Sequence, residues 1–311
     1  MYKRQIDIII PQELHQHRVD VVLAKLFPEY SRNQWINWLK EGCICHHHTP
    51  LTPKLKLNAH SRLYGEIPID TVHTVAIAQD IPLNIVYEDD DLMIINKPAG
   101  LVVHPGAGQA DSTLMNALLF HQPTLETLPR AGIIHRLDKD TSGLLMIAKN
   151  MTSYHLLTKM MSNREIDRQY LALVHGRMIS GASIETCYGR HPKQRLKMAV
   201  RPVGKIAITH YLIAASFHQN TLIKVKLETG RTHQIRVHLS HKGFPIVGDA
   251  LYGKNRAPGV GPVTDALNQF PRQALHAAFL NFNHPMQKKP LTFHAELPDD
   301  FAILLSVLRE G

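Results

Sequence analysis

The segment AGIIHRLDKDTSGLLMIAK (residues 131–149) gives the strongest indication of how this chain folds. Its beginning is apolar, and its end, GLLMIAK (143–149), has the length and composition of a strand buried in a core. Between them, DKDTSG (138–143) consists of residues that favour tight turns. The segment therefore predicts a short charged turn held rigidly between two buried stretches of chain.

The surrounding sequence contains more strand patterns than helix patterns. LMIINKP (92–98) is a second buried strand, and TLIKVKLE (221–228) alternates apolar and charged residues with the period of a half-exposed strand. One helix is predicted to extend through residues 117–119, and a second to extend from about residue 152 to about residue 162. Because strands outnumber helices and do not alternate with them, we expect an α+β fold with a large, mostly antiparallel sheet.

Residues 1–70 form a separate small α/β module in this interpretation. RVDVVLAKLFP (18–28) and SRNQWINWLKEG (31–42) carry apolar residues at helical spacing, and Gly42 is placed to end the second helix. Residues 71–82 have few core-forming side chains, so we expect a linker there. Residues 83–311 then make up the second domain.

Positive charge is concentrated in the second half of the chain. The protein has 311 residues, with 35 Lys+Arg and 26 Asp+Glu, and residues 161–311 hold 20 of the basic and 10 of the acidic side chains. No acidic residue lies between Glu185 and Glu228. Such a stretch suits a polyanion such as nucleic acid, although a pair of solvated strands would also explain it. The RNA-binding candidates are Arg190, Lys193, Arg195, Lys197 and Arg201, together with Arg18 and Arg32 beside the first two helices.

Several classes of protein are disfavoured by the composition. Three cysteines do not make a disulfide framework and fit a reducing compartment. The segment MYKRQIDIIIP (1–11) lacks the features of a secretory signal, so we expect a cytoplasmic location. The longest uncharged run, 206–223, contains several polar residues and does not predict a membrane span. No dinucleotide or phosphate-loop fingerprint occurs, so no nucleotide cofactor is expected.

The run CICHHH (43–48) is the one stretch that looks like metal ligands. Its spacing lacks the paired knuckles of zinc sites, and we interpret it as an exposed turn. No metal is therefore expected.

Two charged segments form the candidate catalytic site. The predicted turn supplies Asp138, and LETGRTHQIRVHLSHKGFPIVGDALYGK (227–254) supplies Arg231 and Arg236. A helix is expected there, capped by Thr232 and ended by Gly243. One arginine can pair with the carboxylate while the other faces a phosphate.

Two alternatives compete with that interpretation. The turn could be an ordinary charged surface turn. Asp138 and Asp140 could also be the acid–base pair of a glycosidase, but residues two apart in one turn rarely span the ~5–9 Å that such enzymes require.

Three segments together resemble a known family. GIIHRLDKDTSGLL, REIDRQYLALVHG and LETGRTHQIRVHLSHKGFPIVGDALYG are similar to the three signature regions of the RluA-type pseudouridine synthases. The resemblance covers essentially the whole chain. It implies that residues 83–311 have the pseudouridine synthase fold and that the N-terminal module is an S4-like RNA-binding domain.

The resemblance also assigns roles to residues. It implies that Asp138 is the catalytic aspartate and that Arg236 forms an ion pair with it. Tyr170 would pack on the uracil ring, and Arg136 would fill the stack vacated by a flipped uridine. His135, beside Arg136, would contact RNA, as would Arg231. An arginine partner favours the ionised form of a carboxylate in a dry pocket, which suits a nucleophile.

The likeness extends to members that modify large-subunit ribosomal RNA. It implies a monomer that acts on this RNA or on the pre-ribosomal large subunit, at the hairpin loop of helix 69. Another ribosomal or transfer RNA site, a non-catalytic assembly factor and an N-glycosidase using Asp138 and Asp140 remain alternatives.

Overall fold

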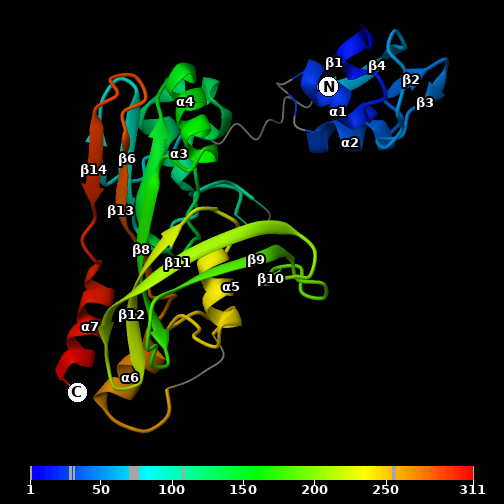
Figure 1. The fold of residues 1–311 in the computed structure, drawn as a ribbon. Helices are drawn as coiled ribbons and strands as arrows, with labels where there is room; N and C mark the ends of the chain where they lie inside the picture. The colour runs from blue at the N-terminus through cyan, green and yellow to red at the C-terminus, as the bar shows by residue number, and fades with distance from the viewer. Residues whose placement is uncertain are drawn as a thin grey trace. The chain divides into compact units, whose positions relative to one another are not determined.

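The computed structural model describes residues 2–27, 30, 32–69, 77–106, 109–253 and 257–310. The chain divides into two compact units, residues 1–75 and 76–311 (Figure 1). The predicted linker 71–82 falls partly on residues outside these ranges. Within it, the backbone N–H of Gln79 donates to the Asn116 carbonyl (3.1 Å), so this part is attached to the larger unit. In the described part of the chain, no helix is both long and apolar enough to span a membrane.

The smaller unit is a four-stranded antiparallel sheet covered by two short helices. The sheet order is β1-β4-β2-β3. Its elements are β1 (Tyr2–Ile9), η1 (Gln12–Leu14), α1 (Val19–Leu26), α2 (Arg32–Lys40), β2 (Ile44–His46), β3 (Thr49–Pro50) and β4 (Arg62–Ile69). The predicted helices are confirmed, because their apolar stripes form the core of the unit through Val22, Leu23, Trp35 and Leu39. Gly42, at φ 75°, ends α2 as expected.

Two of the predicted RNA-binding arginines in this unit contact a buried carboxylate. Asp20 is fully buried and accepts hydrogen bonds from Arg18 (3.0 and 2.9 Å) and from Arg32 (2.9 Å). These contacts tie the start of α2 to the start of α1. The arginine side chains remain 37% and 50% exposed, so each still presents a charged surface to solvent.

A ten-stranded mixed sheet forms the frame of the larger unit. Its order is β10-β9-β11-β12-β8-β13-β7-β6-β5, with β14 paired to β13. Among the described strands of this sheet, only β13 and β7 pair in parallel, so the predicted mostly antiparallel α+β fold is confirmed. The strands are β5 (Ile85–Glu88), β6 (Leu92–Lys97), β7 (Ser142–Ala148), β8 (Asp167–His175), β9 (Ala182–Arg190), β10 (Met198–Val200), β11 (Lys205–Ser216), β12 (Asn220–Leu227), β13 (Leu275–Asn283) and β14 (Pro290–His294).

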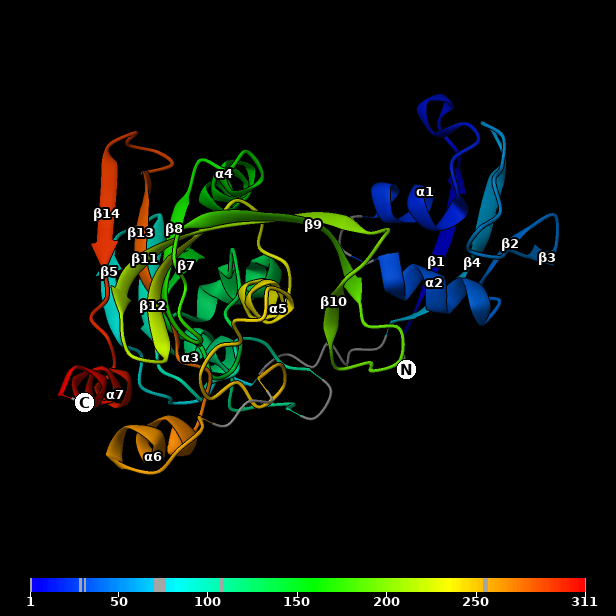
Figure 2. The same ribbon diagram turned by 60° about the horizontal axis from the view of Figure 1, so that its bottom comes forward.

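Helices cover both faces of this sheet. They are α3 (Leu114–His121), η2 (Pro123–Thr127), η3 (Pro129–Gly132), α4 (Met151–Ser162), α5 (Gln234–His241), α6 (Pro262–Gln269) and α7 (Asp299–Glu310). Strands β6 and β7 are buried on both faces, and their alternate residues enter two separate apolar clusters. Helix α3 joins the first cluster and α4 the second. Figure 2 shows α5 beneath the arch that β9, β10 and β11 form.

Gly143, at the start of β7, is required by a close approach of the backbone. Its φ is 113°, and an added Cβ would lie 2.2 Å from the carbonyl oxygen of Ala277 in the parallel neighbour β13. Only glycine fits both conditions. The position matters because Gly143 is the last residue of the predicted turn at residues 138–143.

We expect Gly143→Ala to destabilise the larger unit by about 2–6 kcal/mol, since strained backbone and overpacking each cost about 1–3 kcal/mol. Urea unfolding followed by circular dichroism measures this change. Tryptophan fluorescence would report on the wrong unit, because both tryptophans, Trp35 and Trp38, lie in the smaller unit. Gly189→Ala is the control, as its nearest neighbour would be 3.6 Å away. Equal stability of the two variants would contradict the packing argument.

Two buried histidines, His238 and His276, and the half-buried His135 make the stability of this unit depend on pH. Burial lowers the pKa of His238 to about 4 and that of His135 to about 3, and it also lowers the pKa of His276. Each stays neutral in the folded protein at pH values where it is protonated in the unfolded chain. Their contribution is therefore complete above the unfolded pKa of about 6.5 and is lost as the pH falls below it.

We expect the free energy of unfolding to fall between pH 6.5 and 5, with a slope of up to about 1.4 kcal/mol per pH unit for each proton taken up. Urea titrations at several pH values measure that slope. A stability that is constant over this range would show that these histidines are accessible to protons in the folded state.

Candidate active site

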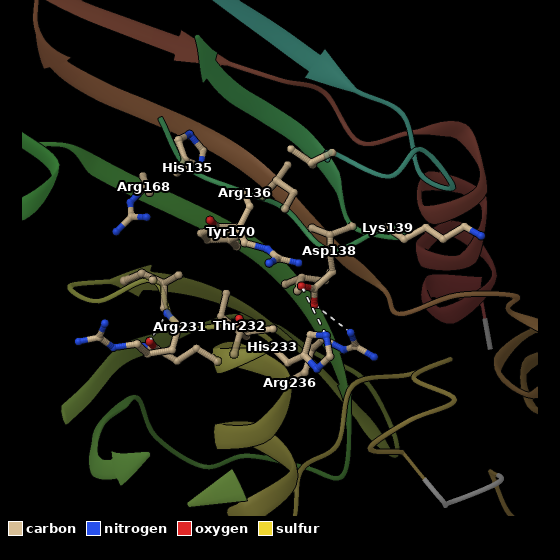
Figure 3. A pocket seen from close by; sticks show the side chains of 18 of the residues that line it. His135, Arg136, Asp138, Lys139, Arg168, Tyr170, Arg231, Thr232, His233 and Arg236 are labelled. Atoms are coloured by element: carbon tan, nitrogen blue, oxygen red, sulfur yellow. Dashed lines mark hydrogen bonds and ion pairs between the residues drawn. The ribbon is translucent and has the colours of Figure 1, made fainter. Parts of the chain in front are cut away.

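A cavity of about 1160 Å³ opens where the predicted turn, strand β8 and the start of α5 meet. Figure 3 shows side chains that line it. Six of the sequence-predicted site residues line this cavity, namely His135, Arg136, Asp138, Tyr170, Arg231 and Arg236. The basic segment 190–205 does not contribute to the lining, and Arg18 and Arg32 belong to the smaller unit.

The turn that carries Asp138 is fixed by hydrogen bonds. The backbone N–H of Thr141 donates to the Asp138 carbonyl (3.1 Å), which closes the turn. The Lys139 carbonyl accepts from the backbone of Gly100 (3.0 Å) and from the Lys97 ammonium (2.9 Å). The Arg272 guanidinium donates to the Asp140 carbonyl (3.2 Å). With its backbone held on three sides, the turn offers the rigid support that a reacting carboxylate requires.

Lys97 is the most unusual of these supports, because it is completely buried. Burial lowers its pKa to about 7, and the charges of Asp140 and Asp138 oppose that shift. Its Nζ donates to the carbonyl oxygens of Pro98 (2.6 Å), Leu101 (2.9 Å) and Lys139 (2.9 Å). Three acceptors match the three N–H groups of an ammonium ion, so this geometry favours the charged form.

Arg236, on α5, links Asp138 to a second carboxylate. Its Nη1 donates to Asp138 Oδ2 (2.8 Å), while Nε and Nη2 donate to the two oxygens of Asp249 (2.7 and 2.9 Å). The Asp249 side chain is fully buried, and that of Asp138 is 14% exposed. The guanidinium is therefore oriented from behind by Asp249, with one N–H directed at the carboxylate that faces the cavity.

The electrostatics of this triad favour full ionisation of the guanidinium and of Asp249. Burial alone lowers the pKa of Arg236, but hydrogen bonds and the negative charges of Asp249 and Asp138 outweigh it and raise that pKa. Burial likewise raises the pKa of Asp249, and its hydrogen bonds to Arg236 more than reverse the effect. Two further donors, the backbone N–H groups of Leu251 and Tyr252, complete the environment of Asp249 (3.0 Å each).

His233 is held in a strained conformation beside the triad. It precedes α5 with φ at 58°, in the left-handed region. The predicted cap at Thr232 is therefore wrong, because the helix begins one residue later and no side chain caps it. The His233 Nδ1 lies 2.8 Å from the Tyr252 hydroxyl, and its Nε2 lies 3.9 Å from Asp138 Oδ1. Burial lowers the pKa of His233, so the ring is predominantly neutral at pH 7.

Tyr170 forms part of the wall beside Asp138. It lies on β8, is 5% exposed and belongs to the main apolar cluster. Burial raises the pKa of its hydroxyl, which therefore stays protonated. A largely buried aromatic ring at a cavity wall can pack against a planar base.

The three remaining predicted residues differ in exposure. Arg136 and Arg231 are exposed at the cavity, where their charges are available to a polyanion. His135 is half-buried, and its Nε2 accepts a hydrogen bond from the backbone of Met146 (3.2 Å). Its Nδ1 is buried without a partner among the described residues.

Sequence reasoning missed Asp249 and Lys97 as parts of the site. Asp249 lies in the segment GDALYG (248–253), which belongs to the third signature, so a signal was present without a role attached to it. Lys97 ends an apolar strand, and nothing in its local sequence indicates that it reaches the turn around Asp138.

One group of metal-type ligands lies together within the described ranges, formed by Asp89, Asp91 and His284. The Nδ1 of His284 accepts hydrogen bonds from the backbone of Met286 (3.2 Å) and Gln287 (3.0 Å). The ring proton therefore resides on Nε2, which donates to Asp89 (2.9 Å). A protonated nitrogen cannot bind a metal. We therefore interpret the cluster as a structural hydrogen bond that connects His284 to Asp89.

Comparison with known proteins gives a consistent result. Residues 91–241 match the family described as RNA pseudouridylate synthase. The chain is 46% identical to a protein named ribosomal large subunit pseudouridine synthase D from Xanthomonas campestris, over 97% of this chain and 92% of the relative. A protein of the same name from Pseudomonas aeruginosa is also 46% identical, over 97% and 95%.

A solved structure shares both the fold and part of the sequence. The human RNA pseudouridylate synthase domain containing 4 protein is 27% identical, covers 73% of this chain and 93% of its own, and has a TM-score of 0.57. The identity to the bacterial relatives extends over nearly the whole chain and shows family membership, which a similar fold alone does not. The chain belongs to the RluA-type family of RNA pseudouridylate synthases.

Proposed function

We propose that this protein converts specific uridines of large-subunit ribosomal RNA to pseudouridine, with Asp138 as the catalytic residue. The observation that carries the proposal is the ion pair of Asp138 with Arg236 in a cavity that Tyr170 also lines. The names of the bacterial relatives support ribosomal RNA as the substrate.

The reaction requires an unusual presentation of the substrate. The C1′–N1 bond of uridine breaks, the base turns, and a C1′–C5 bond forms; C5 loses its proton and N1 gains one. A stacked uridine cannot expose these atoms, so the nucleotide must flip out of its helix, at a cost of a few kcal/mol. Arg136, exposed at the cavity, would fill the vacated stack, and Tyr170 would pack against the uracil.

Asp138 would meet the flipped nucleotide as an anion. Arg236 stabilises the negative charge on one oxygen and leaves the other carboxylate oxygen available to the reacting sugar or base. Asp249 acts as a positioning residue, because it contacts the guanidinium and not the cavity-facing carboxylate. Neighbouring His233 adds a largely neutral ring, so it brings little extra charge to the site.

The finer assignments follow from the same proposal. The helix-69 hairpin loop is the target that the resemblance implies, with residues 1–70 as an S4-like RNA-binding domain and 83–311 as the catalytic domain. The exposed segment 190–205 would contact the RNA outside the cavity. Ribosomal RNA is modified where ribosomes are assembled, which supports a cytoplasmic location, and a monomer is expected to suffice.

A non-catalytic role in ribosome assembly is the main alternative. It requires RNA binding but not a carboxylate fixed at 2.8 Å from a buried arginine. An N-glycosidase would use the same carboxylate and release free uracil.

We expect Asp138→Asn to abolish pseudouridine formation, by at least about 1000-fold, because the variant keeps the shape of the side chain and removes its charge. The measurement is carbodiimide primer extension on large-subunit RNA. Asp140→Asn is the matched control in the same turn and should retain most of the activity. Pseudouridine formation by Asp138→Asn would refute the assignment, and release of uracil by the wild type would favour the glycosidase.

We expect Lys193→Glu combined with Arg195→Glu to weaken RNA binding, because both side chains are exposed in the basic segment. The slope of log affinity against log salt should decrease by about 0.7–0.9 for each RNA phosphate that the variant no longer neutralises. Lys288→Glu with Lys289→Glu makes the same charge change in the β13–β14 hairpin and serves as the control. If the two double variants behave alike, the segment has no specific contact with RNA.

A further inference from the structure

Arg168 is a buried cation in the wall of the cavity. Its exposure is 6%, and it lines the same cavity as Asp138 and Tyr170. Its Nε is buried and has no hydrogen-bond partner among the residues that the structure describes. Within the part of the chain that the structure describes, no carboxylate lies within 4.0 Å of its guanidinium. A buried charge without a partner is costly, so the arrangement indicates that a partner arrives with a ligand.

The acidic residues near Arg168 are occupied by other partners. Glu228 pairs with Arg164 and with His210. Asp167, the neighbour in sequence, pairs with Lys226 (3.0 Å). The loop backbone approaches closely instead, because an added Cβ at Gly230 would lie 3.0 Å from Arg168 Nη1. Among the described residues, the backbone of Gly230, which has no side chain, therefore covers this guanidinium in place of a counterion.

The position of Arg168 relative to Tyr170 suits the dimensions of a nucleotide. The two residues are two apart on β8, so their side chains leave the same face of the strand, about 7 Å from each other. Figure 3 shows Tyr170 between Arg168 and Asp138. A uridine packed on Tyr170 with its sugar at Asp138 would leave Arg168 to the adjoining part of the RNA chain.

We propose that the Arg168 guanidinium binds a backbone phosphate of the RNA next to the flipped uridine, an inference that rests on the proposed function. A phosphate is the group in RNA that carries a full negative charge and offers two oxygens to a planar guanidinium. The oxygens of uracil are neutral and would leave the buried charge uncompensated. Arg168 is thus a substrate-binding residue that holds the flipped state.

The first test is Arg168→Met in the full chain, which keeps the aliphatic volume and removes the charge. We expect kcat/KM for an RNA fragment that the wild type modifies to fall about 10- to 100-fold, the scale of one charged hydrogen-bonded contact. We expect thermal stability to be unchanged or higher, because an unpaired buried charge is removed. Arg168→Lys should retain part of the activity. Arg309→Met, at an exposed site on α7, is the control for the loss of one charge.

The second test identifies the phosphate. Single methylphosphonates, which are uncharged, replace the phosphates on either side of the target uridine one at a time. At one position, we expect a large loss of activity with the wild type and no further loss with Arg168→Met, which is the signature of a direct contact. If the methylphosphonate and Arg168→Met reduce activity independently at every position, so that their effects multiply, the proposal is wrong. It is also wrong if Arg168→Met causes no further loss with an RNA altered in the uracil rather than in a phosphate.

The outcomes also separate this inference from the proposed function. If the wild type modifies no uridine in any large-subunit RNA fragment, the proposed function fails first. If the wild type is active and Arg168→Met has equal kcat/KM, only the phosphate contact is refuted. If Arg168→Met is inactive and markedly less stable, Arg168 is a structural residue and the inference is wrong.

Discussion

The contact on which the site depends is the buried guanidinium of Arg236 between two carboxylates. The guanidinium donates hydrogen bonds to Asp249 in the protein interior and to Asp138 at the cavity. Removing one partner from such a pair costs about 3–5 kcal/mol, because it leaves a charge in a medium that solvates it poorly. The same contacts therefore stabilise α5 against the turn and fix the position of the Asp138 carboxylate at the cavity.

The larger unit is organised so that this contact can form. Asp138 belongs to a turn before β7, whereas Arg236 and Asp249 follow β12. These residues are far apart in the sequence, and the folded sheet brings them together. The turn is anchored by Lys97 at the end of β6, and Arg272 contacts it from before β13. Arg272 is itself held by Asp300 of α7 (2.7 and 2.8 Å). Elements from both ends of the unit thus converge on one short segment.

Positive charge is used in two different ways in this protein. The arginines and lysines of 190–205 are mostly exposed, where solvent and salt screen them, so they suit long-range attraction of a polyanion. Arg236 and Arg168 are buried, where a charge interacts strongly with whatever lies beside it. Arg236 is paired within the protein, while Arg168 has no partner of its own among the described residues. Arg236 therefore maintains the structure of the site, whereas Arg168 is available to bind the substrate.

Local sequence predicted part of the secondary structure, and the family resemblance identified the central residues. The apolar runs of β6 and β7 and the alternation in β12 follow directly from period and composition, and the three signatures pointed to Asp138, Tyr170 and Arg236. The helix start at His233 was not predictable, because a left-handed residue in place of a side-chain cap depends on contacts made by the folded chain. The roles of Asp249, Lys97 and Arg168 were decided by tertiary structure alone. Burial and the presence or absence of a counterion are properties of the assembled sheet, and no residue type or spacing carries them.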